Sequence, residues 1–162
     1  MSLSPSFPSP SFPQRAAAIR RATARLCLLL GWSPLHEVTL PNGRRADILA
    51  LRPDGAFICI EIKSGERDFL TDGKWPDYRD YADALYFAVD ADFPRDILPA
   101  EAGIIVAAET VADLLRDAAT HAITAPRRRS LTHRFATLAA TRLAIADDPA
   151  AAVVLRTALR SE

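Results

Sequence analysis

The run Ala56–Lys63 constrains the fold of this 162-residue chain more than any other segment. Six of its eight residues are apolar, and it follows a turn signal, Arg-Pro-Asp-Gly, at residues 52–55. A short apolar run between turn signals is typical of a strand that is buried on both faces in the centre of a sheet. The segment therefore predicts a sheet flanked by helices.

Two strands precede this run and at least two follow it. Leu35–Leu40 ends at the hairpin signal Pro-Asn-Gly, and Arg44–Leu51 alternates in polarity before the second turn. Together with Ala56–Lys63 they predict a three-stranded meander. Further buried strands are expected at Leu85–Val89 and Gly103–Ala107, and Val111–Asp117 fits either a short edge strand or a helix.

Helical patterns surround these strands. Gln14–Leu30 has an apolar stripe, four arginines and no acidic residue, and residues 66–83 form a helical region with a break before Pro76. Pro126–Ile145 and Pro149–Arg160 each begin with a proline, which the first turn of a helix tolerates. The order of elements predicts an α/β (α+β) protein with a mixed central sheet flanked by helices.

The first thirteen residues differ from the rest of the chain. They contain the pentapeptide Ser-Pro-Ser-Phe-Pro twice, at residues 4–8 and 9–13. Prolines at this density disfavour helix and central strand, so residues 1–13 are expected to form a disordered or polyproline-like arm. No linker interrupts residues 14–162, which predicts a single domain there.

Composition excludes several classes of protein. Hydrophobic residues make up 49% and charged residues 25% of the chain, the balance of a globular protein. No apolar run approaches the roughly 18 residues that a membrane-spanning helix needs. Cys27 and Cys59 lie in apolar surroundings, as free thiols do in a reducing compartment. We therefore expect a cytoplasmic protein with no membrane partner.

The zero net charge conceals an uneven distribution along the chain. Residues 1–60 carry seven arginines and three acidic residues, residues 61–120 carry six basic and fourteen acidic residues, and residues 121–162 carry seven basic and three acidic residues. A carboxylate-rich segment between basic flanks suits a metal-dependent enzyme that acts on a polyanion. Ordinary surface charge that happens to cluster explains the pattern equally well.

Asp47, Glu61 and Lys63 are the residues that point to chemistry. Side chains alternate along a strand, so Glu61 and Lys63 share one face at the end of the central strand. The turn at residues 52–55 folds the preceding strand back, which brings Asp47 beside Glu61. Two carboxylates at one sheet edge form a site for a hard cation. In the alternative interpretation Lys63 extends into solvent and the acids pair with Arg44 or Arg45.

Five blocks of sequence in this order resemble those of the MmcB-type bacterial DNA repair proteins. The Asp47 and Glu61-Ile62-Lys63 motif resembles the core of the PD-(D/E)xK nuclease superfamily, which has the restriction-endonuclease-like fold. The resemblance covers roughly residues 14–145. The five blocks are His36-Glu37-Val38, Arg44-Arg45-Ala46-Asp47, Glu61-Ile62-Lys63-Ser64, Lys74-Trp75-Pro76-Asp77-Tyr78 and Leu85-Tyr86-Phe87-Ala88-Val89.

The resemblance implies a metal-dependent nuclease site. Asp47 and Glu61 would bind Mg²⁺ or Mn²⁺, with the backbone carbonyl of Ile62 as a further ligand, and Lys63 would orient or deprotonate the attacking water. The superfamily often has proline where this chain has Ala46, and often has a third acid in the first helix, where this chain has none. Glu37 either completes the metal site or pairs with an arginine.

Two basic or aromatic clusters are candidate DNA contacts. Lys74 and Tyr78 contact DNA in one interpretation, and in the other the aromatic residues of this block pack its helix onto the sheet. Arg127, Arg128 and Arg129 open a predicted helix, where cations oppose the helix dipole. They either bind backbone phosphates or form a solvated basic face.

Three functional hypotheses follow. The first is a metal-dependent DNA endonuclease, a phosphodiesterase that acts in DNA repair. The second is a DNA-repair binding module that keeps the nuclease-like fold but has weak or no catalytic activity. The third is a domain that recruits a repair protein through its Pro-rich arm. The intact Asp47, Glu61 and Lys63 favour the enzyme, and the missing acid in the first helix favours the binding module or a subunit that needs a partner.

Overall fold

A computed structural model describes residues 11–73, 75–108 and 110–158 of the chain. The chain divides into two compact units, Met1–Ala122 and Ile123–Glu162, where the sequence predicted one domain over residues 14–162. The first ten residues of the predicted arm lie outside the described residues. Helix α1 (Phe12–Leu29) begins two residues before the predicted start, because the Gln14 side chain accepts a hydrogen bond from the Ser11 N–H at 2.7 Å and proline is tolerated in the first turn.

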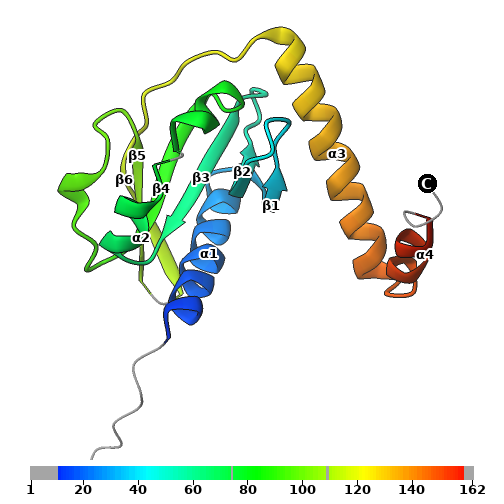
Figure 1. The fold of residues 1–162 in the computed structure, drawn as a ribbon, viewed down its shortest axis with the longest axis horizontal. Helices are drawn as coiled ribbons and strands as arrows, with labels where there is room; N and C mark the ends of the chain where they lie inside the picture. The colour runs from blue at the N-terminus through cyan, green and yellow to red at the C-terminus, as the bar shows by residue number, and fades with distance from the viewer. Residues whose placement is uncertain (1–10, 74, 109, 159–162) are drawn as a thin grey trace, which may run out of the picture. The chain divides into compact units, whose positions relative to one another are not determined.

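The first unit contains a six-stranded mixed sheet whose strand order follows the chain (Figure 1). The first three strands are antiparallel, the third, fourth and fifth are parallel, and the sixth is antiparallel to the fifth. The mixed α/β sheet predicted from the sequence is confirmed, and the ambiguous segment after residue 110 is the edge strand. The strands are β1 (Ser33–Thr39), β2 (Arg45–Leu51), β3 (Phe57–Lys63), β4 (Ala84–Asp90), β5 (Gly103–Ala108) and β6 (Val111–Arg116).

Helix α1 covers one face of this sheet (Figure 1). Its apolar stripe, which includes Ile19, Leu26 and Cys27, belongs to a buried cluster with Ile58 and Ile60 of β3. The other face packs against α2 (Glu66–Thr71) and the 3-10 helix η1 (Trp75–Asp80), and a further 3-10 helix, η2 (Arg95–Ile97), follows β4. The ring of Phe69 meets that of Phe87 edge-on, with 5.3 Å between their centroids. All seven residues of β3 are buried, which confirms its predicted place in the centre of the sheet.

Gly103 at the start of β5 meets the aromatic ring of Tyr86 on β4. A Cβ atom at this position would overlap that ring, and the ring is itself packed edge-on against Trp32. We therefore expect Gly103→Ala to lower the free energy of unfolding by about 1–3 kcal/mol or more, as overpacking of a rigid core does. Gly73→Ala is the matched control, because nothing lies within 4 Å of its added Cβ. Equal melting temperatures of the two variants would contradict this view of the β4–β5 contact.

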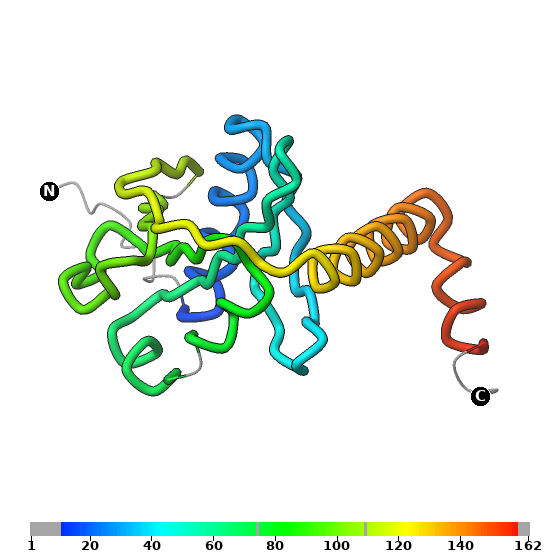
Figure 2. Tube along the Cα trace, turned by 90° about the horizontal axis from the view of Figure 1, so that it is seen from above, coloured from blue at the N-terminus to red at the C-terminus, as the bar shows by residue number. Residues whose placement is uncertain are grey.

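The second unit consists of two helices, α3 (Ala125–Asp147) and α4 (Ala151–Ala158), joined by a short connection (Figure 2). Pro126 lies in the first turn of α3, as predicted. No helix in the described part of the chain is long and apolar enough to cross a membrane. Both cysteines of the chain are free and buried, in agreement with the prediction.

Candidate functional site

Asp47 and Glu61 lie side by side where β2 and β3 separate. The last paired residues of these antiparallel strands are Ile48 and Ile60. Asp47, just before Ile48, and Glu61, just after Ile60, occupy the next position along the two strands. The Ile62 N–H donates a hydrogen bond to Asp47 Oδ2 at 2.8 Å, and the Asp47 N–H donates to Glu61 Oε1 at 3.4 Å. Each carboxylate thus accepts a hydrogen bond from a main-chain N–H group of the other strand. The proximity predicted from the strand alternation and the turn is confirmed.

The two carboxylates share a poorly solvated environment. Glu61 is only 3% exposed, and burial, together with the negative charge of Asp47, raises its pKa to about 8. Burial also raises the pKa of Asp47, although its hydrogen bond from Ile62 and the charges of Lys63 and Arg45 act in the opposite direction. Burial is the main reason that the ionised forms of both acids are disfavoured, and the charge of Lys63 offsets it only in part.

Lys63 is buried and paired, so the interpretation in which it extends into solvent is wrong. Its Nζ atom lies 2.6 Å from Asp72 Oδ2, and its side chain is 6% exposed. Burial lowers the pKa of Lys63, but the hydrogen bond and the charge of Asp72, with those of Asp68 and Glu61, outweigh it and raise this pKa overall. Lys63 is therefore an ammonium group, held in place by Asp72.

Asp72 was not identified from the sequence. It follows α2, in a segment without the alternation that locates side chains on a strand. The sequence shows only that residues 61–120 are rich in acids, and this composition does not single out Asp72.

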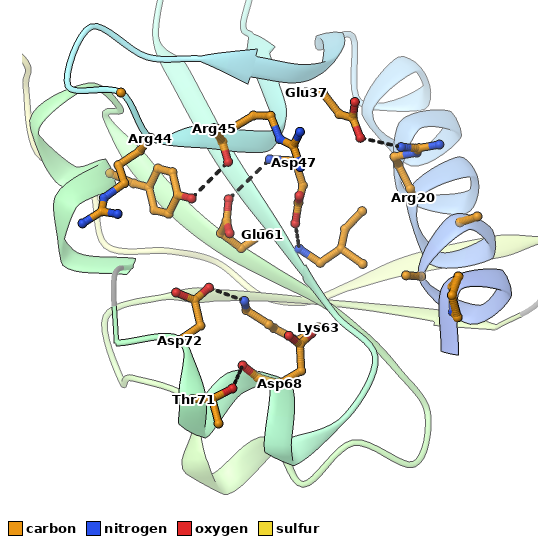
Figure 3. A pocket seen from close by; sticks show the side chains of 16 residues that line it. Arg20, Glu37, Arg44, Arg45, Asp47, Glu61, Lys63, Asp68, Thr71 and Asp72 are labelled. Atoms are coloured by element: carbon orange, nitrogen blue, oxygen red, sulfur yellow. Dashed lines mark hydrogen bonds and ion pairs between the residues drawn. The ribbon is translucent and has the colours of Figure 1, made fainter. Parts of the chain in front are cut away.

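A pocket of about 710 Å³ encloses these groups (Figure 3). Asp47 and Glu61 lie in the middle of the view, between Arg20 of α1 and Arg44 just before β2, and Lys63 lies next to Asp72. The wall combines acidic and basic side chains from α1, the first three strands and α2 with Tyr78 of η1. The remaining lining residues are Pro13, Ala16, Ala17, Glu37, Gly43, Arg45, Ile62, Asp68 and Thr71.

Glu37 lines the pocket and pairs with an arginine. In the β1–β2 register His36 pairs with Ile48 and Val38 with Ala46, so Glu37 lies opposite Asp47. Its φ of 49° falls in the left-handed region, which is uncommon for a residue other than glycine. Glu37 Oε1 lies 3.4 Å from Arg20 Nη1. Glu37 therefore forms the ion pair with an arginine that one of its two interpretations predicted.

Arg44 does not neutralise the two central acids. Its Nε and Nη2 atoms lie 2.8 and 2.7 Å from Asp77 Oδ2, which belongs to η1. The interpretation in which Arg44 pairs with Asp47 or Glu61 is therefore wrong.

The candidate DNA-binding residues lie in three different settings. Tyr78 borders the pocket, but it is only 5% exposed and its hydroxyl donates to the Arg45 carbonyl at 3.1 Å. The packing interpretation therefore describes Tyr78, and no ring face is left for a base. Lys74 lies outside the described residues. Arg127, Arg128 and Arg129 occupy the first turns of α3 in the second unit, and their contact with DNA stays a prediction.

Within the described residues, no group of three or more His, Cys, Asp or Glu side chains is arranged to hold a metal ion. Asp47 and Glu61 are the adjacent carboxylates of this site, joined by the hydrogen bonds described above. The Mg²⁺ or Mn²⁺ cofactor and the Ile62 carbonyl ligand stay predictions.

Comparison with known proteins gives the family. A family model described as "DNA repair protein MmcB-like" matches residues 4–150. The chain belongs to the MmcB-like family. This confirms the resemblance to the MmcB-type proteins found in the sequence and assigns the chain to a family of DNA repair proteins.

The MmcB-like chain is also similar to a solved protein of unknown function from Silicibacter pomeroyi. The two are 36% identical, with a TM-score of 0.80 over 84% of this chain and 93% of that one. No curated protein matches the chain.

Proposed function

We propose that this protein is a metal-dependent phosphodiesterase that cleaves DNA during repair, with Mg²⁺ or Mn²⁺ as its cofactor. The observation that carries the proposal is the arrangement of Asp47, Glu61 and Lys63 in one pocket: two adjacent carboxylates and an ammonium group. Membership in a DNA repair family supports DNA as the substrate.

The residues present fit a divalent cation. Burial raises the pKa of both Asp47 and Glu61, and the nearest buried ammonium, that of Lys63, is paired with Asp72. Asp47 and Glu61 would hold such a cation, and its charge would stabilise their ionised forms. Mg²⁺ typically binds one or two protein carboxylates and completes its coordination with waters and substrate phosphate oxygens, so a pair of acids suffices.

The chain's own groups have separate roles in this proposal. Asp47 and Glu61 hold the cation, which supplies Lewis-acid activation of the phosphate and of a water when it is bound. Lys63, kept protonated by Asp72 at 2.6 Å, orients the water and stabilises negative charge on the phosphate. Hydrolysis forms a bond from the water oxygen to phosphorus and breaks the bond from phosphorus to a sugar oxygen, which leaves with a proton.

Binding of Mn²⁺ tests the metal site without any assumption about the substrate. We expect calorimetry or water-proton relaxation to detect one specific Mn²⁺ ion in the wild type and none in Asp47→Ala, because removal of one carboxylate leaves a single side-chain ligand. The measurement is repeated with short single-stranded and duplex DNA, since phosphate oxygens complete the coordination.

Asp54→Ala is the matched control for this measurement. Asp54 is an exposed acid that pairs with Arg52 in the turn before β3, and it does not line the pocket. Specific Mn²⁺ binding that survives in Asp47→Ala, or that is absent from the wild type with and without DNA, would reject the metal site. A non-catalytic DNA-binding module would then be the better description.

A further inference from the structure

Arginines face the proposed metal site from two different elements. Arg20 comes from α1, Arg45 begins β2 and Arg44 directly precedes it, and all three line the pocket. Figure 3 shows Asp47 and Glu61 between Arg20 and Arg44. A guanidinium group can bind two phosphate oxygens at once through parallel hydrogen bonds. The pocket therefore offers phosphate contacts on both sides of the two acids.

Two of these arginines form ion pairs with exposed carboxylates. Arg20 pairs with Glu37 at 3.4 Å, and Arg44 pairs with Asp77 at 2.7 Å, with both arginine side chains 37% exposed. Exposed ion pairs of this kind contribute only about 0–1 kcal/mol. A phosphate group can therefore replace either carboxylate on its arginine at small cost.

Two of the reacting groups are almost inaccessible from solvent. Glu61 and Lys63 are 3% and 5% exposed, in a pocket of about 710 Å³. Pockets of about 300–1,000 Å³ enclose one small ligand, which is the scale of a nucleotide. In a duplex each phosphate is held on a stiff, stacked and paired column, which restricts how closely it can approach a recessed group. An unpaired strand is flexible enough to bring one phosphate to the acids.

The pocket wall offers no surface for base stacking among the described residues. Tyr78 is its one aromatic lining residue there, and that ring is buried with its hydroxyl bonded to the Arg45 carbonyl. Many proteins that bind single strands stack bases on exposed aromatic rings. Here the charged side chains of the wall favour the sugar–phosphate backbone, which carries no sequence information.

We propose that the pocket binds an unpaired DNA strand through its phosphates, with Arg20 and Arg44 binding the phosphates on either side of the one at Asp47 and Glu61. This proposal rests on the proposed function and names its substrate class. The strand can be a flap, a gap or a free end, and its base sequence is not read.

The test measures the affinity of the full chain for two fluorescent oligonucleotides of equal length and mixed sequence, one single-stranded and one duplex. Ca²⁺ is present, because it takes the same oxygen ligands as Mg²⁺, and denaturing gels verify that the strands stay intact. We expect the single strand to bind at least about tenfold more tightly than the duplex. Arg20→Ala and Arg44→Ala should each weaken single-strand binding several-fold and lower the slope of affinity against salt by about 1.

Two further variants separate this proposal from general charge effects and from misfolding. Arg52→Ala is the matched control, because Arg52 is also 37% exposed and paired with an acid, Asp54, but lies outside the pocket. Asp77→Asn removes the carboxylate that occupies Arg44 and should tighten binding by about 1.5- to 5-fold, the range of an exposed ion pair. A gain in affinity cannot come from loss of structure.

The outcomes are distinguishable. If duplex binds as tightly as single strand, or if Arg52→Ala weakens binding as much as Arg20→Ala and Arg44→Ala do, the single-strand proposal is overturned while a DNA-directed function remains. If neither oligonucleotide binds, the proposed function itself fails and this proposal fails with it.

Discussion

Glu61→Gln should stabilise the metal-free protein at pH 8 while it abolishes metal binding. The pKa of Glu61 is raised from 4.5 to about 8 in the folded protein, so between these values the folded state holds a proton that the unfolded state has lost. The free energy of unfolding of the wild type therefore falls as pH rises from about 4.5 to about 8. At about 1.4 kcal/mol per pKa unit, the buried charge costs on the order of a few kcal/mol at pH 8, and the neutral amide avoids this cost.

Chemical denaturation at pH 5 and pH 8 in EDTA measures this effect. We expect Glu61→Gln to match the wild type at pH 5 and to exceed it at pH 8, and Mn²⁺ to stabilise only the wild type. Glu66→Gln serves as the control, because Glu66 is exposed and does not line the pocket. If the wild type were no less stable at pH 8 than at pH 5, Glu61 would not be a buried, proton-binding acid.

Lys63→Ala should abolish cleavage and leave DNA binding nearly unchanged. Lys63 donates to Asp72 beside the two acids, where its ammonium group can reach the reacting water and the phosphate but is not a metal ligand. Loss of such a positioned group typically slows the chemical step by about 10²- to 10⁴-fold. Single-turnover cleavage and binding isotherms on the same oligonucleotide separate the two properties, and circular dichroism verifies the fold.

Two other variants of the protein's lysines make this result specific. Lys63→Arg should be as inactive as Lys63→Ala, because the planar guanidinium cannot replace a compact ammonium group in a buried ion pair. Lys74→Ala, at a position predicted from the sequence to contact phosphate, should weaken binding without slowing the chemical step. Cleavage at the wild-type rate by Lys63→Ala would remove Lys63 from the mechanism, and a wild-type protein that binds DNA without cleaving it would favour the non-catalytic module.

The sheet and the two central acids could be predicted because both depend on local rules. Alternation along Ala56–Lys63 assigns Glu61 and Lys63 to one face, and a four-residue turn aligns Asp47 with Glu61. Such patterns depend only on the two-residue repeat of a strand and on turn chemistry. The structure therefore places these strands and this pair of acids where the sequence predicted them.

The partners of these residues could not be predicted, because they depend on irregular segments and on packing. Asp72 reaches Lys63 from the end of α2, and Asp77 reaches Arg44 from a 3-10 helix, and neither segment has a period that fixes the direction of its side chains. Burial of Tyr78 likewise depends on how η1 packs against the sheet, so the sequence left both packing and base stacking open for this residue.

The sequential strand order of the sheet has a consequence for how the site is assembled. Each strand pairs with its neighbour along the chain, and Asp47 and Glu61 are brought together by a hairpin that closes over a few residues. Short-range pairings of this kind form fast, since little loop entropy opposes them. A folding chain therefore brings its two acids together early, before the parallel strands, whose longer connections make them slower to join, bury the pair.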